Sequence, residues 1–365
     1  MTISIIDPVG GHGGMDYYDY GLASGLGSNE VVVLYFTCAN TKEREYPNVS
    51  TQTTFHNIWK FTGFIRLYYF LMGYLKSFRL SNKEKTKIFH FHFFDLGTLN
   101  FIVLLMAFFF RQKKVVTLHD VESFYKRSNK IVSNLCLQLI DGIIVHNHFS
   151  KNEFEKSFKY TKEITIIPHG NYLPFVSVLQ EPTIDKIIKL LFFGQIKEVK
   201  GLDILLNAMA IVVRENPYFK LTIAGRPWKT DFGQYKKMIV NLDLVNFVES
   251  HIRFIEDDEV ASFYENADVV VLPYKHIYQS GVLFLTLSYG RTVITSDLEP
   301  FKEVIRHNEN GFNFQSENPE ALASCILNLN QENILETTHN AAKLIKDKFD
   351  WIKIGQQTIN FYNTL

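Results

Sequence analysis

The chain has 365 residues, of which 46% are hydrophobic and 21% charged, and this balance excludes a disordered protein. Lys and Arg together number 38, as do Asp and Glu, so the formal net charge is zero. A neutral balance argues against a generic nucleic-acid binder, which usually has a basic surface. A single hydrophobic core usually stops growing at about 250–300 residues, so we expect two domains.

The cysteines and the N-terminus bear on the cellular compartment. Cys38, Cys136 and Cys325 lie far apart and fit neither a disulfide framework nor a metal site. The first residues lack the basic region and the long apolar core of a signal peptide. The longest apolar run, 101–110, is much shorter than the ~20 residues that a membrane-spanning helix needs. We therefore expect a protein of the reducing cytoplasm without a spanning segment.

Short apolar runs alternate with longer helical stretches in the first half of the chain. The runs are rich in β-branched and aromatic residues, as buried parallel strands are. They lie at 3–7, 31–37, 87–93, 115–120, 142–147 and 164–168. This alternation predicts a doubly wound α/β domain.

The segment 171–185 contains two prolines and has weak periodicity, which indicates an interdomain linker. A second alternation follows, with predicted strands at 189–194, 221–225, 252–256, 269–274 and 292–296 and predicted helices at 203–213, 257–266, 281–289 and 319–329. We therefore expect two Rossmann-like domains, 1–172 and 186–350. They would face a central cleft, where ligands bind at the carboxyl ends of the strands.

A glycine-rich loop follows the first predicted strand and contains Gly10, Gly11, His12, Gly13 and Gly14. Its spacing is not that of the dinucleotide-binding fingerprint GxGxxG. Glycines at this place let backbone N–H groups approach a ligand beside a helix N-terminus. The alternative interpretation is a flexible turn.

Two helix starts in the second half are candidates for binding a diphosphate. A strand ends at Gly194, and Lys200 and Gly201 then open a helix. A lysine there can reach a phosphate, and the glycine permits close approach. The alternative is a solvated lysine at an ordinary helix start.

The second helix start follows the strand at 269–274. Ser280 is a good N-cap, and the first N–H groups of this helix, at Ser280, Gly281 and Val282, suit a nucleotide diphosphate. The alternative is an ordinary capped helix that is buried for packing.

Polar side chains follow two strands of the first domain. His119 and Asp120 end one strand, and Asp95 follows another. Such strand ends face the ligand in this topology, where His and Asp can exchange protons or orient hydroxyl groups. A single strand-end histidine is more often structural, but two polar strand ends together favour a function.

Together these features resemble the glycosyltransferase family 4 superfamily, whose members have the two-domain GT-B fold. The resemblance rests on G-x-x-x-x-x-K-G from Gly194 to Gly201, an A-G strand end at 224–225, an A-D-v-v-v-l-P strand at 267–273 and an E-v-i…n-G segment from Glu303 to Gly311. The pattern F-D-W at 349–351 is similar to the start of the family's C-terminal helix, which crosses back to the first domain and would span 352–365 here.

Three positions depart from that family. Gln195 stands where members usually carry Arg, and Ile277 and Leu285 stand where they usually carry the glutamates of an E-x7-E pair. The carboxylates usual in the retaining family are therefore absent.

The chain is also similar to glycosyltransferase family 94, which contains the β-mannosyltransferase of lipid-linked xanthan units. The similarity covers H-x-H at 90–92, T-L-H at 117–119, H-G at 169–170, and P-Y-K…S-G…L-x-L-S from Pro273 to Ser288. It implies an inverting glycosyltransferase that moves mannose from GDP-mannose onto a lipid-linked oligosaccharide in bacterial surface polysaccharide synthesis.

The resemblance also implies roles for individual residues. Inversion needs a general base for the acceptor proton, for which Asp95 is the first candidate, with Asp120, Asp16 and His119 behind it. The expected donor-binding residues are Gly194, Gln195, Lys200, Gly225, Tyr274, Ser280, Gly281, Val282 and Glu303. The expected acceptor-binding residues are Gly11, His12, Gly13, Gly14, Tyr17 and His92. We expect no cofactor and no metal, with Lys200 and a helix N-terminus stabilising the diphosphate.

Residues 58–80 are rich in aromatic side chains and are followed by more lysines at 83, 85 and 87. This composition suits an interfacial helix on anionic lipid, on the inner face of the plasma membrane. The basic residues within it do not share one clean helical face (Lys60, Arg66, Lys76 and Arg79). The alternative is a crossover helix packed on the first sheet.

Three other functions stay open. One is a retaining family 4 transferase that uses a UDP-sugar, and another is a catalytically silent nucleotide-binding module. The third is another two-domain enzyme, such as a sugar-nucleotide epimerase or a phosphorylase, but no residue matches the catalytic acids or the pyridoxal-phosphate lysine that these need.

Overall fold

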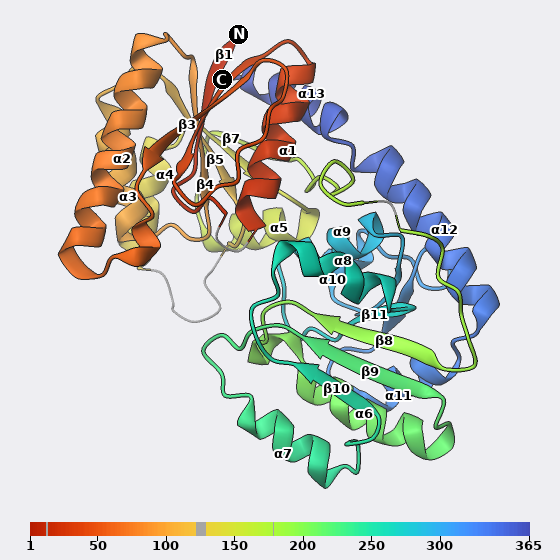
Figure 1. The fold of residues 1–365 in the computed structure, drawn as a ribbon. Helices are drawn as coiled ribbons and strands as arrows, with labels where there is room; N and C mark the ends of the chain where they lie inside the picture. Colours follow the sequence, from red (N-terminus) through yellow and green to blue (C-terminus); the bar gives the residue numbers. More distant parts are fainter. Residues whose placement is uncertain (12–13, 122–128, 178) are drawn as a thin grey trace. The chain divides into compact units, whose positions relative to one another are not determined.

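The computed structural model describes residues 1–11, 14–121, 129–177 and 179–365. They form two compact units (Figure 1). Unit 1 contains residues 1–170 and 349–365, and unit 2 contains residues 171–348. The chain thus returns to unit 1 for its last helix, as the sequence pattern at 349–351 suggests. Each unit is an α/β Rossmann-like fold, which confirms the predicted fold class.

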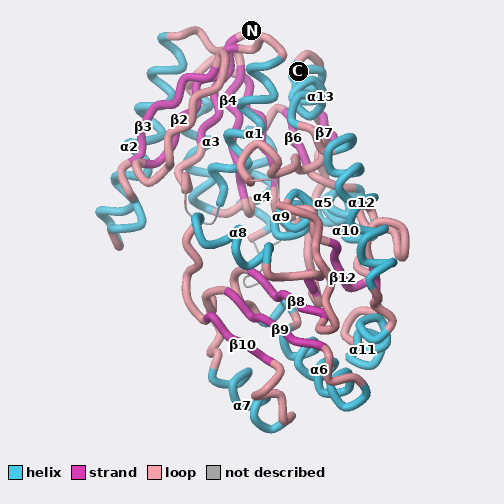
Figure 2. The backbone as a smooth tube through the Cα atoms, turned by 45° about the vertical axis from the view of Figure 1, so that its right-hand side comes forward, coloured by secondary structure: helices cyan, strands magenta, loops and turns pink. Residues whose placement is uncertain are grey.

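The sheet of unit 1, whose strands are magenta in Figure 2, has seven strands in the order β3-β2-β1-β4-β5-β6-β7. Every pair between neighbours is parallel. The central strands are buried on both faces and consist mostly of apolar residues, although one face of β4 carries the buried His90 and His92. The strands are β1 (Thr2–Ile6), β2 (Val32–Cys38), β3 (Val49–Phe55), β4 (Ile88–Phe93), β5 (Lys113–Leu118), β6 (Gly142–Val145) and β7 (Glu163–Ile166).

Helices cover both faces of this sheet. The neighbours α2, α3 and α4 form a row on one face, and α1 contacts α13 on the other (Figure 1). The helices are α1 (Met15–Ser28), α2 (Gly63–Lys83), α3 (Thr98–Phe108), α4 (Lys130–Leu139), α5 (His148–Ser157) and α13 (Trp351–Tyr362), with a short 3-10 helix η2 (Ile58–Lys60) before α2.

Unit 2 has a six-stranded parallel sheet in the order β10-β9-β8-β11-β12-β13. Its strands are β8 (Ile188–Phe193), β9 (Phe219–Ala224), β10 (Val248–His251), β11 (Val269–Leu272), β12 (Thr292–Ser296) and β13 (Phe312–Phe314). Its helices are α6 (Leu202–Glu215), α7 (Gly233–Asn241), α8 (Asp257–Glu265), α9 (Gly281–Ser288), α10 (Glu299–Lys302), α11 (Pro319–Leu327) and α12 (Gln331–Lys348), with a 3-10 turn η3 (Glu198–Lys200) before α6.

Three strands differ from the sequence-based expectation. The predicted strand at 252–256 is wrong: β10 is Val248–His251, a polar edge strand, and the more apolar residues that follow it lie outside the sheet. The strands β3 and β13 were not expected. β3 has the sequence VSTQTTF, which lacks an apolar run because it lies at the edge of the sheet.

The segment predicted as a linker, 171–185, starts inside unit 2. The side-chain amide of Asn171 donates to the carbonyl of Ile345 at 3.2 Å, and the main-chain N–H of Tyr172 donates to the hydroxyl of Ser288 at 2.9 Å. These bonds hold the start of the segment against α9 and α12.

In the part of the chain that the structure describes, no helix is both long enough and apolar enough to cross a membrane.

Candidate functional site

Because all strands are parallel, their carboxyl ends meet at one edge of each sheet, and ligands of open α/β sheets bind at that edge. In unit 2 the expected donor residues Gly194, Gly225 and Tyr274 follow β8, β9 and β11. In unit 1 histidines lie at or after the ends of β4, β5, β6 and β7. Each unit therefore carries a separate candidate site.

Lys200 is the centre of the site in unit 2. A β-carbon built on Gly194 would lie 3.4 Å from the Lys200 Nζ and 3.3 Å from a methyl of Val282, so the ammonium group lies at the end of β8 near the first turn of α9. The Lys200 Nζ also lies 5.2 Å from the centroid of the Tyr274 ring. Burial lowers the pKa of Lys200 to about 8. No described carboxylate pairs with this partly buried cation.

Two glycines let the loops around Lys200 come together. A β-carbon on Gly201 would lie 1.9 Å from the carbonyl oxygen of Pro273, and one on Gly225 would lie 1.8 Å from that of Gly194. Both glycines have positive φ angles, 66° and 150°, which side chains rarely adopt. The glycines are therefore required for the approach of three strand ends to one another.

The N-terminus of α9 forms the other side of this site. The hydroxyl of Ser280 accepts the N–H of Leu283 at 3.2 Å, as the sequence predicts for an N-cap. The N–H groups of the first turn have no acceptor within the helix. A β-carbon on Gly281 would lie 2.9 Å from the hydroxyl of Tyr172, so that hydroxyl also lies at this helix end. Sequence reasoning missed Tyr172, because it assigned the residue to a linker.

The remaining expected donor residues also belong to unit 2. The main-chain carbonyl of Tyr274 accepts the Ser296 hydroxyl at 2.7 Å, and burial raises the pKa of the Tyr274 phenol. Gln195 is half-buried in the loop after β8. Glu303 is half-buried at the C-terminal end of α10.

The site of unit 1 is built around the buried ring of Tyr18 in α1. The rings of His92, His119, His146 and His169 surround it, with centroid distances of 5.2, 5.0, 5.4 and 5.0 Å. Trp351 of α13 closes the cage at 5.4 Å. Only His92 and His119 were expected here. The signal for the others is a histidine at each further strand end, in V-H-N at 145–147 and P-H-G at 168–170.

All of these imidazoles are buried, which favours their neutral forms. Burial holds the pKa values of His92 and His119 well below the usual range and lowers that of His146 to about 4. The pKa values of His90 and His169 are lowered to about 3 for the same reason. Among the described residues, no group of three His, Cys, Asp or Glu side chains is arranged to hold a metal ion.

Unit 1 also contains buried carboxyl groups, one of which, Asp19, lies beside His92. Burial raises the pKa of Asp7, which follows β1, to about 6, and that of Asp19, in α1, well above its usual range. The phenol of Tyr35 donates to the Asp19 Oδ2 at 2.8 Å. Asp16, an expected catalytic candidate, is buried in the first turn of α1.

The other two candidate bases occupy loops at the same sheet edge. The Asp95 Oδ1 accepts the N–H of Gly97 at 2.9 Å and the side-chain amide of Asn100 at 3.1 Å, so the carboxylate also shapes the start of α3. Asp120 follows His119 and is half-buried. The ring of Phe94 stacks on that of His119 at 5.0 Å.

The glycine loop after β1 packs closely against the loop after β2. A β-carbon on Gly10 would lie 2.4 Å from the Thr41 hydroxyl, and one on Gly11 would lie 2.7 Å from the carbonyl oxygen of Asn40. Gly14 is the left-handed N-cap of α1. His12 and Gly13 lie outside the described residues. Beside the loop, the Arg44 guanidinium lies 5.0 Å from the centroid of the Tyr17 ring.

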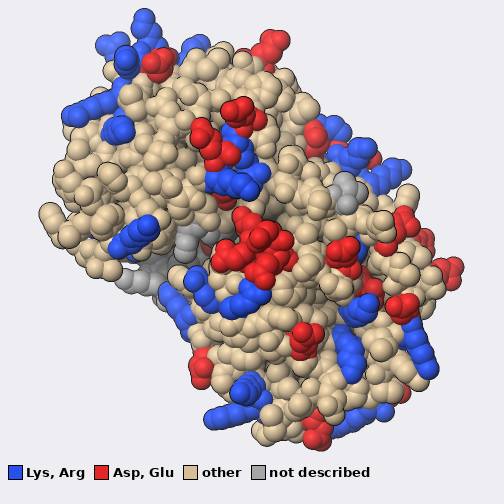
Figure 3. Space-filling model, in the orientation of Figure 1, with Lys and Arg blue, Asp and Glu red and all other residues tan. Residues whose placement is uncertain are grey.

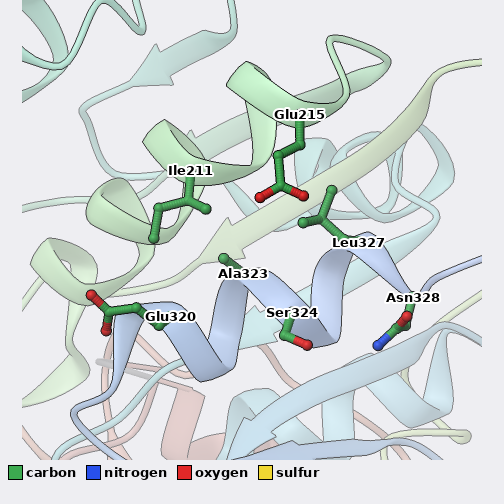
Figure 4. Close-up of a pocket in the computed structure, with 7 residues that line it drawn as sticks. All are labelled: Ile211, Glu215, Glu320, Ala323, Ser324, Leu327 and Asn328. Carbon is green, nitrogen blue, oxygen red and sulfur yellow. The ribbon is translucent and has the colours of Figure 1, made fainter.

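A shallow pocket between α6 and α11 is distinct from these sites (Figure 4). Its side chains come from the C-terminal half of α6, from α11 and from the residue that follows α11, and α6 runs away from the carboxyl ends of the strands. It is lined by Ile211, Glu215, Glu320, Ala323, Ser324, Leu327 and Asn328.

Two family models match the chain, one to each unit. Residues 12–171 match the model described as Glycosyltransferase Family 4, and residues 188–332 match the model described as Glycosyl transferases group 1. Together they span most of both units.

Curated relatives match at low identity. An uncharacterized glycosyltransferase of Methanocaldococcus jannaschii is 27% identical over 229 residues, which are 60% of this chain and 53% of that protein. A GDP-mannose:glycolipid 4-beta-D-mannosyltransferase of Xanthomonas campestris is 27% identical over 192 residues, 52% of each chain. The chain spans about half the length of these relatives.

Among solved structures, HepE of Anabaena in complex with UDP and glucose superposes with a TM-score of 0.75 and 18% identity, over 100% of both chains. This likeness extends the fold assignment to the whole chain.

Proposed function

We propose that this chain, which belongs to the family 4 superfamily of GT-B glycosyltransferases, transfers mannose from GDP-mannose to a lipid-linked oligosaccharide with inversion to a β linkage. The observation that carries the transferase proposal is the partly buried Lys200 ammonium beside the first turn of α9, with which no described carboxylate pairs. Mannose, inversion and the lipid-linked acceptor are supported by the similarity to the Xanthomonas enzyme.

Lys200 and α9 supply the positive charge that a nucleotide diphosphate needs. The leaving group of the reaction is GDP, on which negative charge grows as the C1–O bond breaks. A partly buried ammonium and the N–H groups of a helix start stabilise such charge without reorganisation, more strongly than they would in water. We propose that these groups carry the stabilisation without a metal ion.

The acceptor hydroxyl must lose its proton as its oxygen bonds to C1. A carboxylate is the simplest base for this step, and Asp95, Asp120 and Asp16 are the candidates in unit 1. Ile277 and Leu285 occupy the places of the glutamates usual in the retaining family, and this departure supports inversion by a base in unit 1.

The lipid-linked acceptor is supported by the exposed surface of α2. One face of α2 is buried on the sheet, through Gly73, Tyr74, Ser77, Phe78 and Ser81. The opposite face forms a single stripe, which we call the α2 stripe: Ile65, Tyr68 and Met72, followed by Lys76, Arg79 and Lys83. The helix is therefore a crossover helix and also a candidate interfacial helix.

The apolar half of the α2 stripe suits the acyl-chain boundary of an anionic membrane surface, and the basic half suits its headgroups. The apolar half is well exposed, with 57% of Ile65 and 52% of Tyr68 accessible, and the neighbouring Phe64 is 81% accessible. The adjacent α3 adds Leu105, Phe108 and Phe109 to the exposed apolar surface. Figure 3 shows a broad uncharged face on the left of unit 1, with Lys and Arg side chains gathered above it.

Lys60 and Arg66, two of the basic residues that do not share one helical face in the sequence, lie outside the α2 stripe. The Arg66 guanidinium lies 4.5 Å from the centroid of the Trp59 ring, so Arg66 stacks on an aromatic neighbour outside the α2 stripe. We propose that the apolar half enters the interface and that the basic half contacts lipid headgroups.

Vesicle binding tests the membrane contact. Replacing Lys76, Arg79 and Lys83 by Glu should weaken binding to phosphatidylglycerol vesicles at least about 100-fold, because each basic residue near such a surface contributes about 1 kcal/mol. The matched control replaces Lys236, Lys237 and Lys343, exposed lysines of unit 2, by Glu. Equal binding by both triple variants would refute the contact.

The transfer itself is tested with radiolabelled GDP-mannose and a series of polyprenyl-diphosphate-linked oligosaccharides. We expect a labelled glycolipid whose mannose is released by a β-mannosidase. Release only by an α-mannosidase would refute inversion, and labelling from UDP-sugars alone would refute the mannose assignment. No transfer from any donor, by protein that still binds nucleotide, would indicate a silent nucleotide-binding module.

A further inference from the structure

The buried histidines of unit 1 form a continuous chain of close contacts between polar atoms, which ends at a carboxyl group. The His146 Nδ1 lies 3.0 Å from the carbonyl oxygen of Ile167, and the His146 Nε2 lies 3.3 Å from the His119 Nδ1. The His119 Nε2 lies 3.3 Å from the His92 Nδ1. Finally, the His92 Nε2 lies 3.4 Å from the Asp19 Oδ1.

The direction of this chain follows from the group at its end. A carbonyl oxygen can only accept, so His146 must carry its proton on Nδ1. The lone pair of its Nε2 then accepts from His119, and the Nε2 of His119 accepts from His92, because a neutral imidazole has one donor and one acceptor. The Nε2 of His92 is thus left needing a donor.

Asp19 is placed to provide that donor. Among the described residues, neither the Asp19 Oδ1 nor the His92 Nε2 has a hydrogen-bond partner, and the two atoms lie 3.4 Å from each other. Four contacts between polar atoms lead from Asp19 to Ile167, and each needs one proton to become a hydrogen bond. Three neutral imidazoles supply three of these protons. With His119 and His146 buried and neutral, the fourth proton belongs to the pair of Asp19 and His92.

We propose that Asp19 is a protonated carboxylic acid that starts a one-way hydrogen-bond relay through His92 and His119 to His146, which locks each ring with its proton on Nδ1. The surroundings favour the neutral acid. Asp19 is fully buried and lies against the carboxyl group of Asp7, with Asp16 also near, and its other oxygen accepts from Tyr35. A second negative charge beside Asp7 would be costly.

The relay assigns His119 a positioning role. Both of its nitrogens are engaged within the relay, so neither is available to take the proton of a substrate. In this respect the inference deepens the proposed function, because the acceptor proton must then go to a carboxylate such as Asp95, Asp120 or Asp16. The hydrogen bonding itself does not depend on which sugar is transferred.

The test is nitrogen NMR of the full chain labelled with 15N-histidine, recorded without substrate at neutral pH. The two ring nitrogens report directly which one carries the proton. Signals are assigned by their loss in His92→Gln, His119→Gln and His146→Gln. We expect the Nδ1–H tautomer for all three rings. An Nε2–H tautomer at His119 or His146, or a doubly protonated His92 paired with an ionised Asp19, would overturn the proposal.

Two variants of Asp19 sharpen this test. Asp19→Asn should keep the tautomers, because the amide can donate to His92 while its oxygen still accepts from Tyr35. Asp19→Leu, which cannot donate, should release His92 and His119 into mixed tautomers. Loss of the pattern in Asp19→Asn would also contradict the proposal. The readout is independent of activity, so a failed transfer assay would not decide it.

Discussion

A β-carbon added to Gly25 of α1 would lie 1.9 Å from the carbonyl oxygen of Trp351 in α13. A second glycine, Gly355, meets Gly25 from the other helix, where its own β-carbon would lie 2.4 Å from that backbone. The C-terminal helix therefore packs on the first helix of unit 1 through backbone contact, and it places the Trp351 ring against Tyr18.

This contact predicts that Gly25→Ala destabilises the protein. Alanine usually stabilises a helix by about 0.5–1 kcal/mol relative to glycine, but overpacking here should cost about 1–3 kcal/mol. The control is Ser24→Ala, one residue earlier in the same helix, where the side chain is half-buried. Thermal unfolding followed by circular dichroism measures both. A melting temperature for Gly25→Ala at or above that of Ser24→Ala would contradict the packing described.

The charge of Lys200 predicts that nucleotide affinity depends on pH. With a pKa of about 8 in the free protein, Lys200 loses its proton as the pH rises through that value, so the affinity for a nucleotide diphosphate should fall above pH 8. Lys200→Met should bind about 10–100-fold more weakly at pH 7, because a hydrogen bond to a charged group contributes about 1.5–3 kcal/mol. Calorimetric titration over pH 6.5–9.5 measures this effect.

In Lys200→Met the fall in affinity above pH 8 should disappear, whereas the surface variant Lys236→Met should retain it. If the affinity of Lys200→Met still fell above pH 8 as in the wild type, Lys200 would be excluded from the diphosphate site. The sign for stability is opposite: between pH 8 and 10.5 the unfolded chain binds more protons at this lysine, so its contribution to stability rises with pH.

The assignment of the base predicts a selective loss of turnover. Replacing Asp95, Asp120 and Asp16 by Asn, one at a time, should lower kcat by about 10²–10⁴-fold in one variant only. The affinity for nucleotide should stay unchanged in all three, because these residues belong to unit 1. The control is Asp141→Asn, because Asp141 precedes β6 and so lies at the amino ends of the strands, away from the candidate bases. Wild-type kcat in all three variants would show that the base lies elsewhere.

The neutral histidines predict that acid destabilises unit 1. Because their folded pKa values lie below the unfolded value, the unfolded chain binds more protons between about pH 4 and 6.5, and stability is lost as the pH falls through this window. Each such group contributes a slope of about 1.4 kcal/mol per pH unit. Asp7 and Asp19 oppose this trend, since their pKa values are raised, but five histidines outweigh them.

Melting temperatures at pH 7 and pH 5 measure this effect. We expect a clear decrease at pH 5 in the wild type, a smaller decrease in His169→Gln, and an unchanged decrease in His339→Gln, whose side chain is exposed on α12. A melting temperature that rises toward pH 5 would mean that the carboxyl groups dominate.

Much of the fold could be predicted from the sequence because buried parallel strands have distinctive runs. The predicted strand at 292–296 coincides with β12, and the helix start at Ser280 is capped as expected. The edge strands β3 and β10 could not be predicted in the same way, because hydrogen bonds to one neighbour define them and their side chains are polar.

The two sites differ in how much of them the sequence reveals. Lys200 and Gly201 were predictable from a local spacing, because one short loop carries them. The relay was not, since Asp19, His92, His119 and His146 come from four different elements, and only the parallel sheet brings them together. Tyr18 and Trp351 were missed as site residues for a similar reason, because only the rings that surround them in the fold distinguish them from ordinary core aromatics.

The most direct test of the central claim is the thermal stabilisation of the purified chain by GDP, GDP-mannose, UDP, UDP-glucose, UDP-N-acetylglucosamine and CMP. A ligand that binds only the folded state raises the melting temperature by mass action. We predict a shift with GDP and GDP-mannose alone, and its loss in Lys200→Met. A shift with uridine nucleotides alone would contradict the mannose assignment, and no shift with any nucleotide would contradict a nucleotide-sugar site in unit 2.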